Sequence, residues 1–211
     1  MTDRLDPARL DELWDFSNPA ASAQRFRDEK AEGTARAELQ TQLARALGLA
    51  GDTSGADAVL DAITSGEPVV RIRVALERGR LFNSAGRPAE ALPVFSEALD
   101  SAEAAGEDFL AVDAAHMLAI ADEEHSGEWA ARGIQMVAAS TDARTKRWAI
   151  ALHNNLGWLH HDAGLFEEAL AEFELAAEAA TTHGSAQQQQ WAREAIAEAL
   201  QSLGRSTAPP Q

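Results

Sequence analysis

The feature of this sequence that most constrains its fold is a residue spacing that occurs twice. In GRPAEALPVFSEAL (residues 86–99) and in GLFEEALAEFELAA (residues 164–177), a glycine is followed five positions later by Ala-Leu, and then by phenylalanine and alanine at further intervals of three. Another glycine precedes each segment by seven residues, at Gly79 and Gly157. Intervals of three, four and seven place side chains on one face of an α-helix, so each copy predicts two helices joined by a turn.

Weaker copies of the same pattern occur elsewhere in the chain. The turn glycines of the four copies, Gly51, Gly86, Gly127 and Gly164, are 35, 41 and 37 residues apart. Such periods are typical of stacked helical hairpins. The composition agrees, because the strong helix formers alanine, leucine, glutamate, glutamine and arginine dominate and no alternating strand pattern occurs. We therefore expect an all-α fold.

The best copy resembles the tetratricopeptide repeat (TPR) family. Within residues 149–183, NLGWLHHDAGLFEEALAEFELAAE matches the leucine–glycine, turn glycine, alanine and aromatic positions of that family. The resemblance implies a right-handed α-solenoid, a TPR-like superhelix of antiparallel helix hairpins. In each hairpin, small residues such as Gly157 and Ala169 are expected where the helices cross, and Phe173 is expected to fill the space beside them.

The predicted organisation is a single TPR-like solenoid over residues 1–204 and a disordered tail over residues 205–211. The solenoid comprises a degenerate N-terminal repeat, four repeats and a C-terminal capping helix, at residues 7–36, 37–70, 72–105, 113–146, 150–183 and 185–204. A solenoid needs a terminal helix with a polar outer face to cover the end of its hydrophobic core. In that helix, Trp191, Ile196 and Leu200 are expected on the buried side.

The third repeat departs from the pattern. It keeps Gly127 at the expected turn and Met136 at the large apolar position. Arg132, however, stands where alanine is expected. We therefore predict that the second helix of this repeat is shifted by one residue, onto Ala131.

Charge and residue types exclude several kinds of partner. The chain carries 34 acidic and 18 basic residues, which gives a net charge of −16. Such a surface repels nucleic-acid phosphates and anionic lipids, so we expect neither nucleic-acid nor membrane binding. The absence of cysteine removes disulfides and thiol nucleophiles and fits a reducing compartment. With no signal peptide and no eighteen-residue apolar run, a cytoplasmic location is expected.

Histidines concentrate in HNNLGWLHHDAG, residues 153–164. In the repeat register, His153 and His160 lie where the TPR family packs aromatic residues, which favours a half-buried structural role. The alternative is a metal site between adjacent repeats. Its candidate ligands are His125, His160, His161 and Asp162. Because no compact hydrolase motif such as HExxH is present, we expect no catalytic residues and no cofactor.

The resemblance also implies where a ligand binds. In TPR proteins the first helix of each hairpin lines a concave groove, which typically holds an extended peptide or a helix of a partner. The corresponding residues of this chain are Arg45, Arg73, Leu76, Arg80, Asn83, Met117, Asn154, Trp158 and His161. We expect the three arginines to orient an anionic group, because guanidinium suits carboxylates.

Both the arginines and the tryptophan of this set admit a second interpretation. The arginines can instead form ion pairs with Glu38, Glu77 or Glu90 and merely keep the face solvated. Trp158 is an interface anchor if it is exposed in the groove. It can instead be covered by the C-terminal helix that carries Trp191.

These features favour a non-catalytic interaction scaffold that binds a peptide or helix of a partner protein in its groove. Three alternatives stay open at this point. The chain could be a regulator that responds to a peptide or small ligand, or a metal-binding protein that uses the histidine cluster. It could also self-associate into a homo-oligomer, because an incompletely capped solenoid can stack end to end.

Overall fold

The computed structural model describes residues 4–205, and every regular element among them is helical. The all-α prediction is therefore confirmed. The chain divides into two compact units, Met1–Leu110 and Ala111–Gln211. Within the described range, no helix is both long and apolar enough to cross a lipid bilayer. Most of the predicted disordered tail, residues 206–211, lies outside the described residues, as do residues 1–3.

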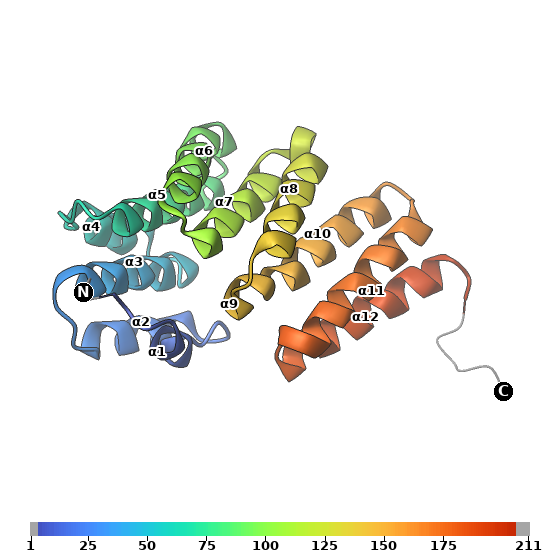
Figure 1. Cartoon of the computed structure of the whole chain (residues 1–211), viewed down its shortest axis with the longest axis horizontal. Coiled ribbons are helices and arrows are strands. Elements are labelled where there is room, and N and C mark those ends of the chain that lie inside the picture. Colours follow the sequence, from blue (N-terminus) through green and yellow to red (C-terminus); the bar gives the residue numbers. More distant parts are fainter. Residues whose placement is uncertain (1–3, 206–211) are drawn as a thin grey trace. The chain divides into compact units, whose positions relative to one another are not determined.

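The N-terminal unit consists of six helices and the start of a seventh (Figure 1). These are α1 (Pro7–Leu13), α2 (Pro19–Asp28), α3 (Gly33–Leu49), α4 (Thr53–Asp61), α5 (Pro68–Ser84), α6 (Pro88–Ala105) and the first residues of α7 (Asp108–Ala121). Local signals explain where they begin and end. The side chains of Asp6 and Asn18 cap α1 and α2. Gly51 and Gly86 follow α3 and α5 with φ of 87° and 69°, as the predicted turn glycines require.

The α5–α6 hairpin shows why the repeat combines small and large residues. Ala91 and Phe95 of α6 are completely buried. A Cβ atom at Gly79 of α5 would overlap the ring of Phe95. Glycine therefore lets the two helices approach until the phenylalanine fills the space between them.

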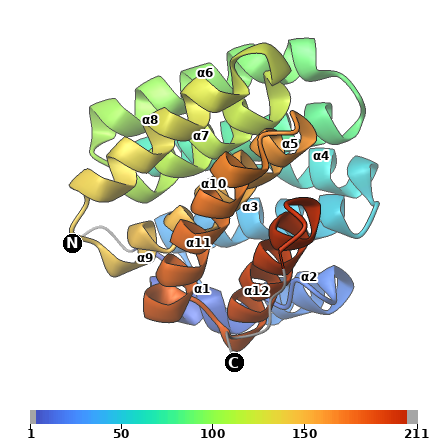
Figure 2. The same ribbon diagram turned by 90° about the vertical axis from the view of Figure 1, so that its right-hand side faces the viewer.

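The C-terminal unit begins within α7 and contains five further α-helices (Figures 1 and 2). After the 3₁₀ turn η1 (Glu123–His125) come α8 (Ser126–Ala139), α9 (Ala143–Lys146), α10 (Trp148–Asp162), α11 (Phe166–His183) and α12 (Ala186–Ser202). The α10–α11 hairpin repeats the packing of α5–α6. A Cβ atom at Gly157 would overlap the ring of Phe173, and Ala169 is completely buried. The predicted small–large register is confirmed in both hairpins.

The turn of the third repeat was predicted wrongly. Gly127 lies inside α8 and does not have the positive φ of the other turn glycines. The connection is made instead by Asp122, with φ of −107° and ψ of 82°, and by the 3₁₀ turn that follows it. Because this connection needs no left-handed residue, no glycine is required there.

The buried face of α8 also differs from the predicted register. Gly133 and Val137 are buried, whereas Ala131 is exposed and Met136 is only partly buried. A Cβ atom at Gly133 would lie 3.0 Å from Cδ2 of Leu152, so this glycine takes the small-residue position.

The final helix forms as predicted, but one of its residues faces elsewhere. A capping box of Ser185 and Gln188 begins α12. Ile196 and Leu200 pack on the core of α11, as expected. Trp191 does not, because its side chain is 58% exposed and the buried stripe is made of alanines. Arg205, the first residue of the predicted tail, forms an ion pair with Glu167 at 2.6 Å.

Candidate functional site

The arginines predicted to receive an anion are ion-paired within the N-terminal unit. Arg73 is 9% exposed, and its Nε donates to Oε2 of Glu38 at 3.1 Å. Arg80 donates to Oε1 of Glu77 at 2.6 Å. The pairing interpretation is thus confirmed for these two arginines. Their charges are already compensated, which argues against a carboxylate-binding role.

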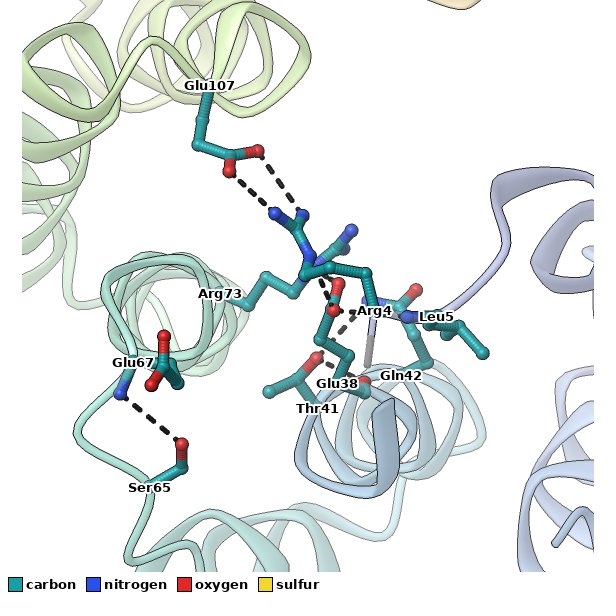
Figure 3. A network of polar contacts seen from close by, with 9 residues as sticks. All are labelled: Arg4, Leu5, Glu38, Thr41, Gln42, Ser65, Glu67, Arg73 and Glu107. Atoms are coloured by element: carbon teal, nitrogen blue, oxygen red, sulfur yellow. Dashed lines mark hydrogen bonds and ion pairs between the residues drawn. The ribbon is translucent and has the colours of Figure 1, made fainter. Parts of the chain in front are cut away.

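Glu38 is the centre of a wider polar network (Figure 3). Besides Arg73, it accepts hydrogen bonds from Nε of Arg4 at 2.8 Å and from the backbone N–H of Leu5 at 3.3 Å. Arg4 also bridges to Glu107, with 2.8 Å between Nη1 and Oε1. A fully buried carboxylate requires such partners, because burying an uncompensated charge is costly. The network therefore compensates the buried charge of Glu38 and joins the N-terminal segment to α3 and α5.

The other predicted groove residues of the N-terminal unit are also occupied in packing. Leu76 is 1% exposed and contributes to the core. The guanidinium carbon of Arg45 lies 5.8 Å from the ring centroids of both Trp14 and Phe16. This arrangement is a cation–π contact. Asn83 is half-buried near the end of α5.

The C-terminal unit contains a cavity that is large enough for a ligand. The cavity has a volume of about 530 Å³, within the range of typical ligand sites. It lies between α10 and α12, and we call it the α10–α12 groove (Figure 2 shows the three helices that form it). Its lining residues are Ile150, Ala151, Asn154, Asn155, Trp158, Ala176, Gln188, Trp191, Ala192, Glu194, Ala195 and Glu198. Two predicted groove residues, Asn154 and Trp158, are among them.

Small side chains create the α10–α12 groove. Ala176, on α11 between the other two helices, is 1% exposed, and Ala192 and Ala195 of α12 are 3% and 4% exposed. Ala151 of α10 also lines the groove. Larger side chains at these positions would fill the space, because protein interiors pack to crystal-like density. The alanines therefore form the base of the groove.

A tryptophan from each wall lines the groove. Trp158 of α10 is 38% exposed and Trp191 of α12 is 58% exposed. The ring of Trp158 is held in edge contact with Phe173 and His161, at centroid distances of 5.0 and 5.3 Å. The neighbouring helix thus leaves the Trp158 side chain partly accessible. The predicted covering of Trp158 by the C-terminal helix is incomplete.

The polar groups of the groove are amides and carboxylates. Gln188, Trp191, Glu194 and Glu198 follow one another at helical spacing along α12, and all four line the groove. Among the described residues, no ion pair involves Glu194 or Glu198, and only Gln190 donates a hydrogen bond to Glu194, at 2.7 Å. No lysine, arginine or histidine lines the groove. The site is therefore apolar with an anionic side.

Met117 and His161 do not line this groove. Met117 is 9% exposed. His161 lies beside the groove, in contact with Trp158, and its Nε2 shares a hydrogen bond of 3.0 Å with Oγ of Ser202. His161 thus contacts both the tryptophan ring and the end of α12.

The candidate metal ligands are not brought together. Nδ1 of His125 bonds to Asp122 at 3.1 Å, and this hydrogen bond raises the pKa of His125. His153 pairs with Glu172 at 2.7 Å, in the half-buried structural role expected for it. In the part of the chain that the structure describes, no group of three histidine, aspartate or glutamate side chains could hold a metal ion. Separate contacts thus engage His125, His153 and His161.

Comparison of the sequence with models of protein families gives no match, and comparison with curated proteins gives none either. The case for a function therefore rests on the residues of the α10–α12 groove. Sequence reasoning missed Trp191, Glu194 and Glu198. Their helical spacing was visible in the sequence, but the same spacing also fits a solvated face, and only the position of α10 distinguishes the two.

Proposed function

We propose that this chain is a TPR-like helical-repeat protein that binds a segment of a partner protein in the α10–α12 groove. The repeat hairpins α5–α6 and α10–α11, with their matching glycine–phenylalanine contacts, support a right-handed α-solenoid as the architecture. In that architecture α10 is the first helix of the last repeat and α12 is the capping helix. The groove then corresponds to the concave face on which the resemblance places the ligand.

The observation that carries the proposal is the pair of exposed tryptophans on the two walls of the groove. Trp158 and Trp191 together give an apolar surface above a base of alanines. Tryptophan is enriched among the few residues that dominate interface energies. Asn154 beside them supplies an amide that can bond to the backbone of a bound segment.

The proposal requires binding and no chemical step. The groove offers two carboxylates on one helix and three amides, and its lining contains no serine, threonine, cysteine, lysine or histidine. Affinity comes from burial of the tryptophan rings and of an apolar side chain of the ligand. Specificity comes from the amides and the carboxylates.

A displayed library of random peptides tests the proposal. Peptides selected on the full-length chain should lose about 30-fold in affinity for the Trp158→Ala/Trp191→Ala variant, the effect of removing an interface hot spot. The matched control is Leu165→Ala/Leu175→Ala, which removes two apolar side chains of similar exposure, 45% and 44%, outside the groove. Circular dichroism establishes that both variants fold. Selected peptides that bind the tryptophan variant as tightly as the wild type would contradict the proposal.

A further inference from the structure

We infer that the partner segment of the α10–α12 groove is basic, with an arginine or lysine beside an apolar residue. This inference rests on the proposed function, since it names the chemistry of the ligand for the same groove. It replaces the anion-binding role expected from the arginines in the sequence. Those arginines lie in the N-terminal unit, where Arg73 and Arg80 are paired with Glu38 and Glu77.

The charges that line the groove favour a cation. Glu194 and Glu198 contribute two carboxylates, and no basic residue of the lining offsets them. Neither carboxylate forms an ion pair with any residue from 4 to 205, so both can receive a charged donor from a ligand. The nearest arginine in the sequence, Arg193, is engaged with Gln190 at 2.8 Å. An anionic segment would meet like charges at this wall.

The aromatic residues favour the same ligand. A guanidinium or ammonium group binds to the face of an indole ring, and tryptophan is the best of the aromatic residues for this purpose. Trp191 and Glu194 are one helical turn apart on α12, and Glu198 is one turn further. A single arginine side chain of the ligand could therefore contact the indole ring and a carboxylate together. A guanidinium suits this combination because it stacks on rings and forms forked hydrogen bonds to carboxylates.

The base of the groove selects the neighbouring residue. The alanines Ala176, Ala192 and Ala195 present methyl groups and no hydrogen-bonding side chains. A polar side chain of the ligand would lose its water there without a replacement partner. The favoured segment therefore places an apolar residue on the alanines and its basic residue against Trp191 and the carboxylates.

The long-range field acts in the same direction. The chain has a net charge of −16, which attracts a basic segment and accelerates its association at low salt. This field acts on any cation, so it does not identify the groove. The test must therefore separate the local carboxylates from the total charge.

Two glutamate-to-glutamine variants make that separation. Glu194→Gln/Glu198→Gln removes both groove carboxylates, and Glu168→Gln/Glu174→Gln removes two exposed carboxylates of α11 that do not line the groove. Both variants have the same net charge. Two probes are used. The first is an arginine-containing peptide selected from the displayed library, and the second is the same peptide with citrulline, the uncharged isostere, in place of each arginine.

We expect the arginine peptide to bind the wild-type chain about 10-fold more tightly than the citrulline analogue, in isothermal titration calorimetry. This preference should fall to less than about 3-fold in Glu194→Gln/Glu198→Gln and persist in the α11 control. Spermine serves as a free amine without an apolar residue. If spermine displaces the peptide at equal concentration, the groove is a site for small cations and the inference is wrong.

The outcomes also distinguish this inference from the proposed function. Selected peptides that are acidic or uncharged, yet lose binding with Trp158→Ala/Trp191→Ala, overturn the inference and leave the groove as the binding site. Selected peptides that bind that variant normally overturn both. An equal loss in the two glutamine variants would show that net charge alone attracts the peptide, and it would also overturn the inference.

Discussion

The buried Glu38–Arg73 pair gives the strongest prediction about stability. The Glu38 side chain is 1% exposed and that of Arg73 is 10% exposed, so neither is well screened by solvent. Replacing Arg73 by methionine keeps most of the side-chain volume but leaves the Glu38 carboxylate in the interior with a weaker set of partners. We expect the Arg73→Met variant to be less stable mainly because of that remaining charge, and not because a favourable contact is lost.

The magnitude follows from the geometry around Glu38. Breaking a buried ion pair by removing one partner costs about 3–5 kcal/mol. Arg4 remains bonded to Glu38 at 2.8 Å, but its side chain is 37% exposed, so its compensation is partial. The cost of Arg73→Met should therefore be about 3 kcal/mol, at the lower end of that range.

The double variant Glu38→Met/Arg73→Met tests the reasoning. It removes both buried charges, and it leaves the backbone N–H of Leu5 and Nε of Arg4 without their Glu38 acceptor. Arg4 is part-exposed and keeps its bond to Glu107, so the main loss is that of the Leu5 hydrogen bond, about 1 kcal/mol. We therefore expect the double variant to be more stable than Arg73→Met alone by about 1–2 kcal/mol. Urea unfolding followed by far-ultraviolet circular dichroism at pH 7 measures both. A double variant that is equally or less stable than Arg73→Met would refute the argument that an uncompensated buried charge causes the loss.

Three further predictions concern single positions. Gly157→Ala should destabilise the chain by about 1–3 kcal/mol, because the added methyl group meets the ring of Phe173, and Phe173→Leu in the same chain should recover part of the loss in thermal unfolding. Gly127→Ala should stabilise the chain by about 0.5 kcal/mol, because the position is helical and alanine favours a helix more than glycine does. The nearest atom to the new Cβ, Cδ2 of Leu159, is 3.8 Å away, so the methyl group fits. A decrease in Tm would contradict this prediction. The hydrogen bond to Asp122 raises the pKa of His125 above 6.5. The protonated imidazole therefore stabilises the folded chain: this stabilisation is fully present below the pKa that His125 has in the unfolded chain, and it is lost as pH rises through the pKa of the folded chain. In an NMR titration the His125 midpoint should lie above 6.5 and fall in Asp122→Asn, and an unchanged midpoint would contradict the assignment.

Much of the helical framework could be predicted from the sequence. The packing of small residues against phenylalanine in the two best repeats, seen in Gly79 with Phe95 and Gly157 with Phe173, was expected from the repeated spacing together with the TPR resemblance. This was feasible because helical periodicity is local: an interval that recurs along one chain determines which residues share a helix face. The prediction failed at Gly127, where a 3₁₀ turn made the glycine unnecessary.

The tertiary structure decided which polar and aromatic groups are available to a ligand. Arg73 had the sequence features of a groove residue, but Glu38, 35 residues away, engages it in the interior. Trp191 was expected to be buried, but alanines occupy the buried stripe of α12 and the indole lines the groove with Trp158. Periodicity along a helix determines which side chains point the same way. Whether that face meets a core, an opposite charge or an open groove depends on helices distant in sequence, because burial and electrostatic pairing are properties of the packed chain.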